Sequence, residues 1–253
     1  MSSDSRCTQK LKKLKLQKLL STLDKYRSIV KSSKLFEETI QCIGEATNIK
    51  SIWCLALGSP SESMEALYQL AYVEEIGNYF NLTATSLWFY DPIFNDIDKD
   101  MLVSQRDHQI KAEGDFHIDK VLLFLPHASL ELTNHILEKY RPQLFLGNDL
   151  ISHTDRLTKK RIFEQYPLLA TLIQIVDYKM EKKIQENEFT TVVNTKKKKN
   201  RKNRGVYHES NIDYDFELCY AAKVEITRYM NTQGEWQNAF SDLAFHLIIP
   251  KEH

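Results

Sequence analysis

The sequence predicts an α/β fold: a Rossmann-like, open, doubly wound sheet that is mainly parallel and carries helices on both faces. From residue 50 onward, short and nearly continuous apolar runs alternate with amphipathic stretches. Such runs are typical of parallel strands whose two faces are both covered by helices. At 253 residues, of which 42% are hydrophobic, the chain is also long enough for one medium domain with appendages.

Four strands are predicted from runs of large apolar residues that each end at a turn-forming residue. They cover residues 51–57, 86–90, 120–125 and 143–146. A further apolar run, 243–249, is expected to return to the sheet as an edge or near-edge strand. Residues 168–180 are compatible with either a strand or a helix.

Apolar residues at three- and four-residue spacing predict helices between these strands. The predicted helices cover 62–80, 95–104, 130–140 and 155–165. The third is expected to begin after Ser129 as its cap and to end at Arg141-Pro142. A Lys- and Leu-rich stretch at 10–30 predicts an N-terminal helix or a partly ordered arm, for which contact with a membrane surface is one alternative.

Charge divides the chain into a body and two basic segments, although the formal net charge is zero. Residues 1–34 hold ten basic and two acidic residues, and 195–204 hold seven basic residues and no acid, which leaves about −15 on the remainder. We expect a basic N-terminal helix or arm at 1–48 and an α/β domain at 49–253, with a disordered basic insertion at about 182–211. The acidic body argues against nucleic-acid binding except through the basic segments.

The glycine and cysteine positions exclude several classes of enzyme. The seven glycines are scattered along the chain, whereas dinucleotide, phosphate-loop, kinase and nucleophile-elbow motifs need clustered glycines. The four cysteines form no Cys-x-x-Cys pair, and no run is apolar enough to span a bilayer. The sequence therefore contains no motif from which a catalytic group, a metal ligand or a cofactor can be assigned. A reducing compartment such as the cytoplasm or the nucleus is expected.

The candidate site follows from where ligands bind in open α/β sheets, which is beyond the carboxyl ends of the strands. The polar and small residues that follow the predicted strands are Gly58, Ser59, Ser61, Glu62, Asp91, His127, Asn148 and Asp149. We expect one side chain from each of four strands to converge on a shared cleft at this rim. The four are Ser59, Asp91, His127 and Asn148.

Two of these segments have a structural and a ligand-binding interpretation. Ser59, Pro60 and Glu62 fit a helix-capping box, and the same helix start is suited to bind an anion or the polar edge of a ligand. Asp91 follows the second strand, where dinucleotide-binding folds use an acid to hold ribose hydroxyls. Asp91-Pro92 is equally a turn signal.

The remaining candidates are also open to two interpretations. His127 suits acid–base chemistry, but no Ser or Cys is placed as its nucleophile, which favours a hydrogen-bonded structural role. Asn148-Asp149 fits an Asx turn as well as a polar site. A basic patch, read as a solvated linker or as a nuclear-import or polyanion-binding segment, comprises Lys196, Lys197, Lys198, Lys199, Arg201, Lys202 and Arg204.

Five blocks in this order resemble the Sensitivity to Red Light Reduced family. They are WCLALGSPSES at 53–63, YDPIF at 90–94, LPH at 125–127, LGN at 146–148 and AFSDLAFH at 239–246. The chain departs from the family pattern at Ala128, where a Cys is expected, at Asp149, where Ser is usual, and at Ser241, where Asn is common. The first departure argues against chemistry that depends on a cysteine there.

The resemblance implies a regulatory protein without an established enzymatic activity, acting with protein partners. Plant members of the family are linked to light signalling and clock regulation, animal members to clock gene expression and haem metabolism, and fungal members to microtubule-related phenotypes. The Lys-rich segments fit a fungal member. The expected cleft predicts binding of a small, nucleotide-like ligand. The alternative functions are a divergent nucleotide- or S-adenosylmethionine-dependent transferase and an interaction scaffold that uses its basic arms.

Overall fold

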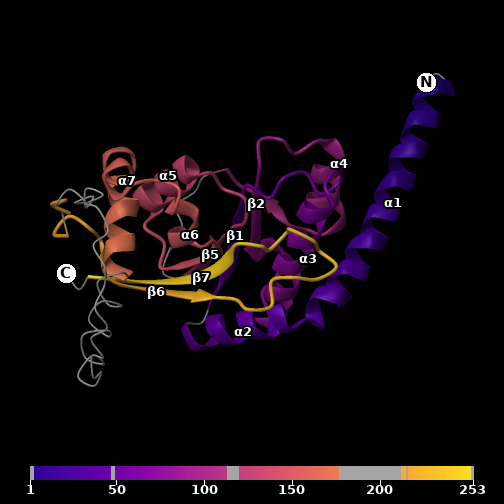
Figure 1. Cartoon of the computed structure of the whole chain (residues 1–253). Coiled ribbons are helices and arrows are strands. Elements are labelled where there is room, and N and C mark those ends of the chain that lie inside the picture. The colour runs from indigo at the N-terminus through magenta and orange to yellow at the C-terminus, as the bar shows by residue number, and fades with distance from the viewer. Residues whose placement is uncertain (1–2, 47–48, 113–119, 177–211, 215, 252–253) are drawn as a thin grey trace, which may run out of the picture.

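A computed structural model describes residues 3–46, 49–112, 120–176, 212–214 and 216–251. Within these residues the chain forms one seven-stranded sheet with the order β3-β2-β1-β4-β5-β7-β6 (Figure 1). The strands are β1 Ser51–Leu55, β2 Leu87–Tyr90, β3 Gln109–Ile110, β4 Val121–Leu125, β5 Leu144–Asn148, β6 Ala221–Arg228 and β7 Leu243–Pro250. Strands β1 to β5 pair with one another in parallel. Strand β7 pairs antiparallel with both β5 and β6.

Helices connect and cover the strands. They are α1 Ser3–Lys31, α2 Lys34–Ala46, α3 Met64–Tyr79, α4 Asp96–Lys99, α5 Leu130–Tyr140, α6 Leu150–Thr154 and α7 Lys159–Gln165. A 3-10 turn, η1 Ala84–Ser86, precedes β2, and a π-helical turn, η2 Asp100–Gln105, follows α4. Residues 167–176 are also helical.

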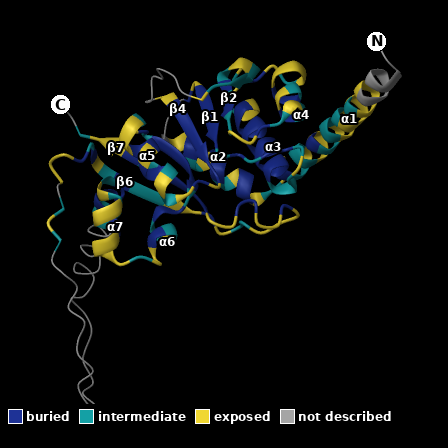
Figure 2. Ribbon diagram, turned by 90° about the horizontal axis from the view of Figure 1, so that it is seen from above, coloured by how far each residue is buried: buried dark blue, intermediate teal, exposed yellow. Residues whose placement is uncertain are grey.

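The sheet has a hydrophobic core on each face because alternate residues of a strand point to opposite sides. In β1, Ile52 and Cys54 pack with α1, α2 and α3, while Trp53 and Leu55 pack with α5 and the helical residues 167–176. The central strands are buried along their whole length, as Figure 2 shows. Burial on both faces confirms the predicted doubly wound α/β fold, with an antiparallel pair added at one edge.

The two N-terminal helices pack on the first of these cores. Leu23 and Val30 of α1 and Ile43 of α2 are at most 1% exposed there. Arg27 of α1 adds an ion pair with Glu75 of α3, with 2.7 Å between Arg27 Nε and Glu75 Oε1. Residues from both sides of position 48 therefore share one core, and the N-terminal half of α1 extends past the body (Figure 1).

Three local expectations are wrong. The predicted helix at 62–80 begins at Met64, because the side chain of Ser63, rather than that of Ser59, caps it by accepting a hydrogen bond from Ala66 N. The predicted helix at 95–104 divides into α4 and the π-helical turn η2. The predicted helix at 155–165 begins only at Lys159, where Thr158 is the cap.

Several further elements had weak or no signals in the sequence. The ambiguous segment at 168–180 is helical to residue 176. Helix α2 and strand β6 were not predicted, and β7 takes the near-edge position expected for the last apolar run. The insertion expected at 182–211 lies outside the described residues.

Candidate functional site

The carboxyl ends of the parallel strands meet at one rim of the sheet, and the predicted site residues follow them. The structure divides this rim into two halves. One half, called here the β1–β2 half, consists of residues 58–63 and 91–98. The other, called the β4–β5 half, consists of residues 126–129, 148–153 and 238–243.

In the β1–β2 half, Asp91 connects the ends of two adjacent strands. Its Oδ2 accepts a hydrogen bond from the backbone N–H of Gly58 at 2.8 Å, and its Oδ1 accepts one from Ile93 N at 3.0 Å. Gly58 has a φ of +80°, a left-handed conformation that favours glycine. Asp91 thereby holds the turn after β1 in position. Of its two interpretations from the sequence, this geometry matches the turn signal.

The polar side chains that follow are bound to each other around Asp98. This carboxylate is 0% exposed. Its Oδ2 accepts from Ser59 Oγ at 2.6 Å and from Asn95 N at 3.0 Å, and its Oδ1 accepts from Ser61 N at 2.8 Å. The amide of Asn95 also donates to Glu62 Oε1 at 3.2 Å. The candidates Ser59, Ser61 and Glu62 therefore belong to one hydrogen-bond network, whose exposed edge at Glu62 and Asn95 borders an open hollow against α1.

The β4–β5 half instead encloses a pocket of about 340 Å³. His127 and Ser129 enter it from the end of β4, and Asn148 from the end of β5. His153 of α6 contributes a second imidazole, and residues 238–243, which precede β7, form the opposite wall. The hydroxyl of Ser129 caps α5 by accepting from Leu132 N at 3.2 Å.

A buried glutamine positions His127. Gln69 of α3 is 0% exposed, and its Nε2 lies 2.7 Å from both His127 Nε2 and the carbonyl oxygen of Ala239. Since one amide nitrogen carries two hydrogens, it can donate both bonds. His127 Nε2 is then an acceptor, so the neutral ring carries its proton on Nδ1. Gln69 thus ties together α3, the end of β4 and the wall before β7.

Burial shifts the two imidazoles of the pocket toward their neutral form. Burial lowers the pKa of His127, and the carboxylates of Glu65 and Asp242 oppose this effect. Burial also lowers the pKa of His153, again opposed by Asp242. A pKa below the ordinary histidine value of 6.5 favours the uncharged ring, so both imidazoles are suited to hydrogen bonding beside the Asp242 carboxylate that lines the pocket.

Asp149 lies behind the pocket wall and fixes it. Burial by itself would raise the pKa of Asp149, but hydrogen bonds from Ser152 and Arg228 outweigh burial and lower it. Its backbone N–H donates to Asp242 O at 2.8 Å, and its side chain caps α6. Asn148 donates from Nδ2 to Ala128 O at 3.2 Å, which joins the ends of β5 and β4.

The structure therefore brings together two of the four side chains expected in one cleft, His127 and Asn148. Ser59 and Asp91 lie at the same rim but in the β1–β2 half. The sequence reasoning did not identify Gln69, His153 or Asp242 as site residues. For Asp242 the only signal was its place in the late block at 239–246, and for His153 and Gln69 there was none.

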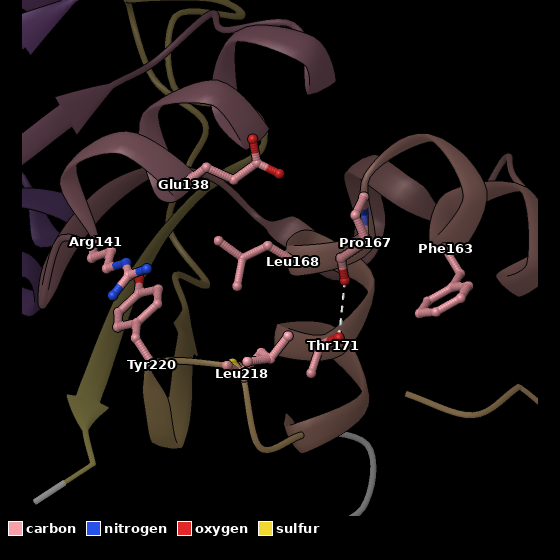
Figure 3. Close-up of a pocket in the computed structure, with 9 residues that line it drawn as sticks. Glu138, Arg141, Phe163, Pro167, Leu168, Thr171, Leu218 and Tyr220 are labelled. Atoms are coloured by element: carbon pink, nitrogen blue, oxygen red, sulfur yellow. Dashed lines mark hydrogen bonds between the residues drawn. The ribbon is translucent and has the colours of Figure 1, made fainter. Parts of the chain in front are cut away.

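A second cavity, of about 370 Å³, lies at the opposite end of α5, near the amino ends of the strands (Figure 3). Arg141 and Glu138 border it, above an apolar wall that includes Leu168 and Leu218. Tyr220 is held there by donating from its hydroxyl to Pro142 O at 3.2 Å. No strand contributes its carboxyl end to this cavity, so the rim pocket is the stronger candidate site.

No group of three or more His, Cys, Asp and Glu side chains in the described part of the chain is placed to hold a metal ion. None of the helices within it is both long and apolar enough to cross a membrane.

The fold and the pocket define a Rossmann-like α/β protein with a ligand-sized cavity beyond the carboxyl ends of its strands. The chain belongs to the SRR1 domain family, whose model matches residues 19–247. This range begins in the packed half of α1 and ends in β7. No curated protein matches the chain, and no solved structure does.

Proposed function

We propose that the chain is a regulatory protein that works by binding a small polar ligand in the rim pocket. Membership of the SRR1 domain family supports the regulatory role. The observation that carries the ligand is the pocket itself: His127, His153 and Asn148 present hydrogen-bonding groups to a cavity of about 340 Å³. Cavities from about 300 Å³ upward are of a size that encloses small ligands.

The chemistry of the lining indicates the class of ligand. The described residues that line the pocket include Asp242 but neither lysine nor arginine, so a phosphate group has no cation to bind there. Neutral imidazoles and amides both donate and accept hydrogen bonds. A nucleoside-like molecule without charged phosphates, or with a positive group toward Asp242, is the ligand that this lining favours.

Calorimetry with nucleosides, S-adenosylmethionine and nicotinamide cofactors tests this proposal. We expect a member of the panel to bind wild-type protein, and His153→Ala and Asn148→Ala to weaken that binding at least tenfold. Glu62→Ala is the matched control, because Glu62 lies in the β1–β2 half and should leave affinity unchanged. If no compound binds, or if the pocket variants bind as tightly as wild type, the pocket is not the site.

A transferase that uses a nucleotide or S-adenosylmethionine is the second candidate. The neutral His127 ring, within the influence of Asp242, favours it, because a neutral imidazole is competent as a general base at pH 7. Ribose binding by Asp91 would have to use lone pairs that Gly58 N and Ile93 N leave free. Turnover of the bound cofactor that is lost in His127→Ala would support this candidate over a purely regulatory ligand site.

The basic patch at 196–204 supports a third element of the proposal, which concerns location and protein partners. Its residues lie outside the described part of the chain, so the argument rests on charge alone. Seven basic residues without an acid are suited to nuclear import or to an acidic partner. Deleting 195–204 should shift the protein from nucleus to cytoplasm; an unchanged distribution and unchanged polyanion affinity would leave the patch a linker.

A further inference from the structure

Helix α1 has two different faces. The leucines at positions 16, 19, 20 and 23 follow the three- and four-residue spacing that places side chains on one face of a helix. They pack on the core of the body. Beyond them the N-terminal half of the helix extends away from the body (Figures 1 and 2). Among the described residues, no helix or strand covers the side of α1 that points away from the body.

The outward face combines leucine with lysine. Leu11 and Leu14 are 62% and 53% exposed, although large apolar side chains are usually covered. Lys18 follows them on the same face at four- and seven-residue spacing, and Lys10 and Lys15 flank the pair. Lys25 continues the face one heptad after Lys18. All four lysines are exposed.

These lysines are not neutralised by the protein itself. No acidic residue occurs between Asp4 and Asp24, and Asp24 points toward Arg27 and Arg106 instead. Lys12, which faces the body, pairs with Asp100 at 2.7 Å between Nζ and Oδ2. Among the described residues, by contrast, no ion pair involves Lys10, Lys15, Lys18 or Lys25.

We propose that this outward face of α1 is a docking surface for an anionic lipid membrane, on which the helix lies parallel to the surface. Lysines at the flanks would contact lipid phosphates, and Leu11 and Leu14 would enter the boundary between headgroups and acyl chains. The acidic body, at about −15 outside the two basic segments, is repelled by the same membrane. Leu11 and Lys15 lie at the edge of this face and border an open hollow with Glu62 and Asp96. The side that carries Lys10, Leu14 and Lys18 points away from the body, so docking through that side keeps most of the acidic surface at a distance.

The residue types on the face favour lipid over nucleic acid. Among residues 10–25 there is no arginine and no aromatic residue, whereas binding to single-stranded nucleic acid typically uses aromatic stacking and arginine. Exposed leucines contribute nothing to phosphate contacts in water, but they do contribute to insertion at a lipid interface. The predicted binding is reversible and sensitive to salt, because most of it is electrostatic.

Flotation of the full chain with phosphatidylcholine vesicles, with and without phosphatidylserine, tests the proposal. We expect binding only when phosphatidylserine is present, and release at high salt. Changing Lys10, Lys15, Lys18 and Lys25 to Gln should weaken binding by about fivefold for each lysine. Leu11→Ser with Leu14→Ser should weaken it by about tenfold, through the lost apolar insertion.

The matched control removes the same charge from exposed lysines of the body, outside both basic segments, by changing Lys50, Lys120, Lys139 and Lys160 to Gln. This variant should retain phosphatidylserine binding, and circular dichroism should show all variants folded, since the changed α1 residues are exposed. The proposal is overturned by absence of binding at low salt, or by an equal loss in the control variant. It is also overturned if the leucine variant binds like wild type or if a short single-stranded RNA outcompetes the vesicles.

Discussion

The two halves of the rim begin from the same kind of sequence and reach different structures. In both, a buried parallel strand ends and polar residues follow at once. In the β1–β2 half, Ser59, Asn95 and Asp98 hydrogen-bond to each other in the interior. In the β4–β5 half, His127 and His153 face an open cavity with Asp242 nearby.

The difference teaches that position at a strand end identifies the rim but does not identify the binding site. A buried carboxylate such as Asp98 needs several donors to offset its desolvation, and neighbouring loops in the β1–β2 half supply them. In the β4–β5 half the wall comes from residues 238–243, which belong to a distant part of the chain. Changes at Asp98, His246, Gly147 and Asp242 test how each half is held together.

The largest expected effect comes from removing Asp98. Asp98→Ala leaves the buried donor Ser59 Oγ and the partly buried donors Ser61 N and Asn95 N without their acceptor, and we expect the unfolding free energy to fall by about 4 kcal/mol. Asp96→Ala, at an exposed position in the same helix α4, should change it by less than about 0.5 kcal/mol. Urea unfolding measures both. Equal effects would show that the network does not hold the β1–β2 half.

The next effect is a pH dependence from His246, which lies beneath the pocket wall. This side chain is 0% exposed, its Nε2 accepts from Leu150 N, and burial lowers its pKa from 6.5 to about 4. The unfolded chain therefore binds a proton that the folded chain does not, and stability is lost as pH falls from 6.5 toward 4. The loss reaches about 3 kcal/mol.

Urea unfolding at a series of pH values checks this slope. His246→Gln should flatten it over the same interval while leaving stability above pH 6.5 lower than in wild type, because two buried hydrogen bonds are altered. A variant that retains the full slope would assign the proton uptake to other groups, with His127 and His153 the first to consider.

A smaller effect is expected at Gly147, in the strand that carries Asn148 to the pocket. A Cβ at this position would lie 2.6 Å from the backbone oxygen of Leu125 and 2.5 Å from the Phe145 ring. Gly147→Ala should therefore push β5 and β4 apart and cost about 2 kcal/mol. Thermal unfolding measures it; Gly44→Ala, with nothing within 4 Å of its Cβ, is the control and should not destabilise the protein.

The smallest effect on stability is expected at Asp242, which sharpens the contrast with Asp98. Asp242→Asn should change the unfolding free energy by less than about 1 kcal/mol. Because the Asp242 carboxylate raises the pKa of both His127 and His153 against burial, its loss should lower both values further. Histidine titration by NMR measures this change. Unchanged titration of both rings would place the charge of Asp242 outside the pocket.

Some helices and strands could be predicted from the sequence, and others could not. The strands at 51–55 and 121–125 were predictable because burial on both faces demands uninterrupted apolar residues. The start of α3 was not, because Ser59 and Ser63 both offer capping hydroxyls and Asp98 engages the first. Strand β6 was missed because only two of its eight residues are buried at the sheet edge, which leaves a weak apolar pattern.

Patterns among neighbouring residues establish the alternation of strands and helices, the rim where polar residues gather, and the separation of basic segments from an acidic body. These features are local: each is written in the spacing and chemistry of neighbouring residues. Only the tertiary structure decided that His127 and Asn148 share a pocket while Ser59 and Asp91 do not. That choice depends on contacts over long sequence distances, such as Gln69 with Ala239, which no local pattern encodes.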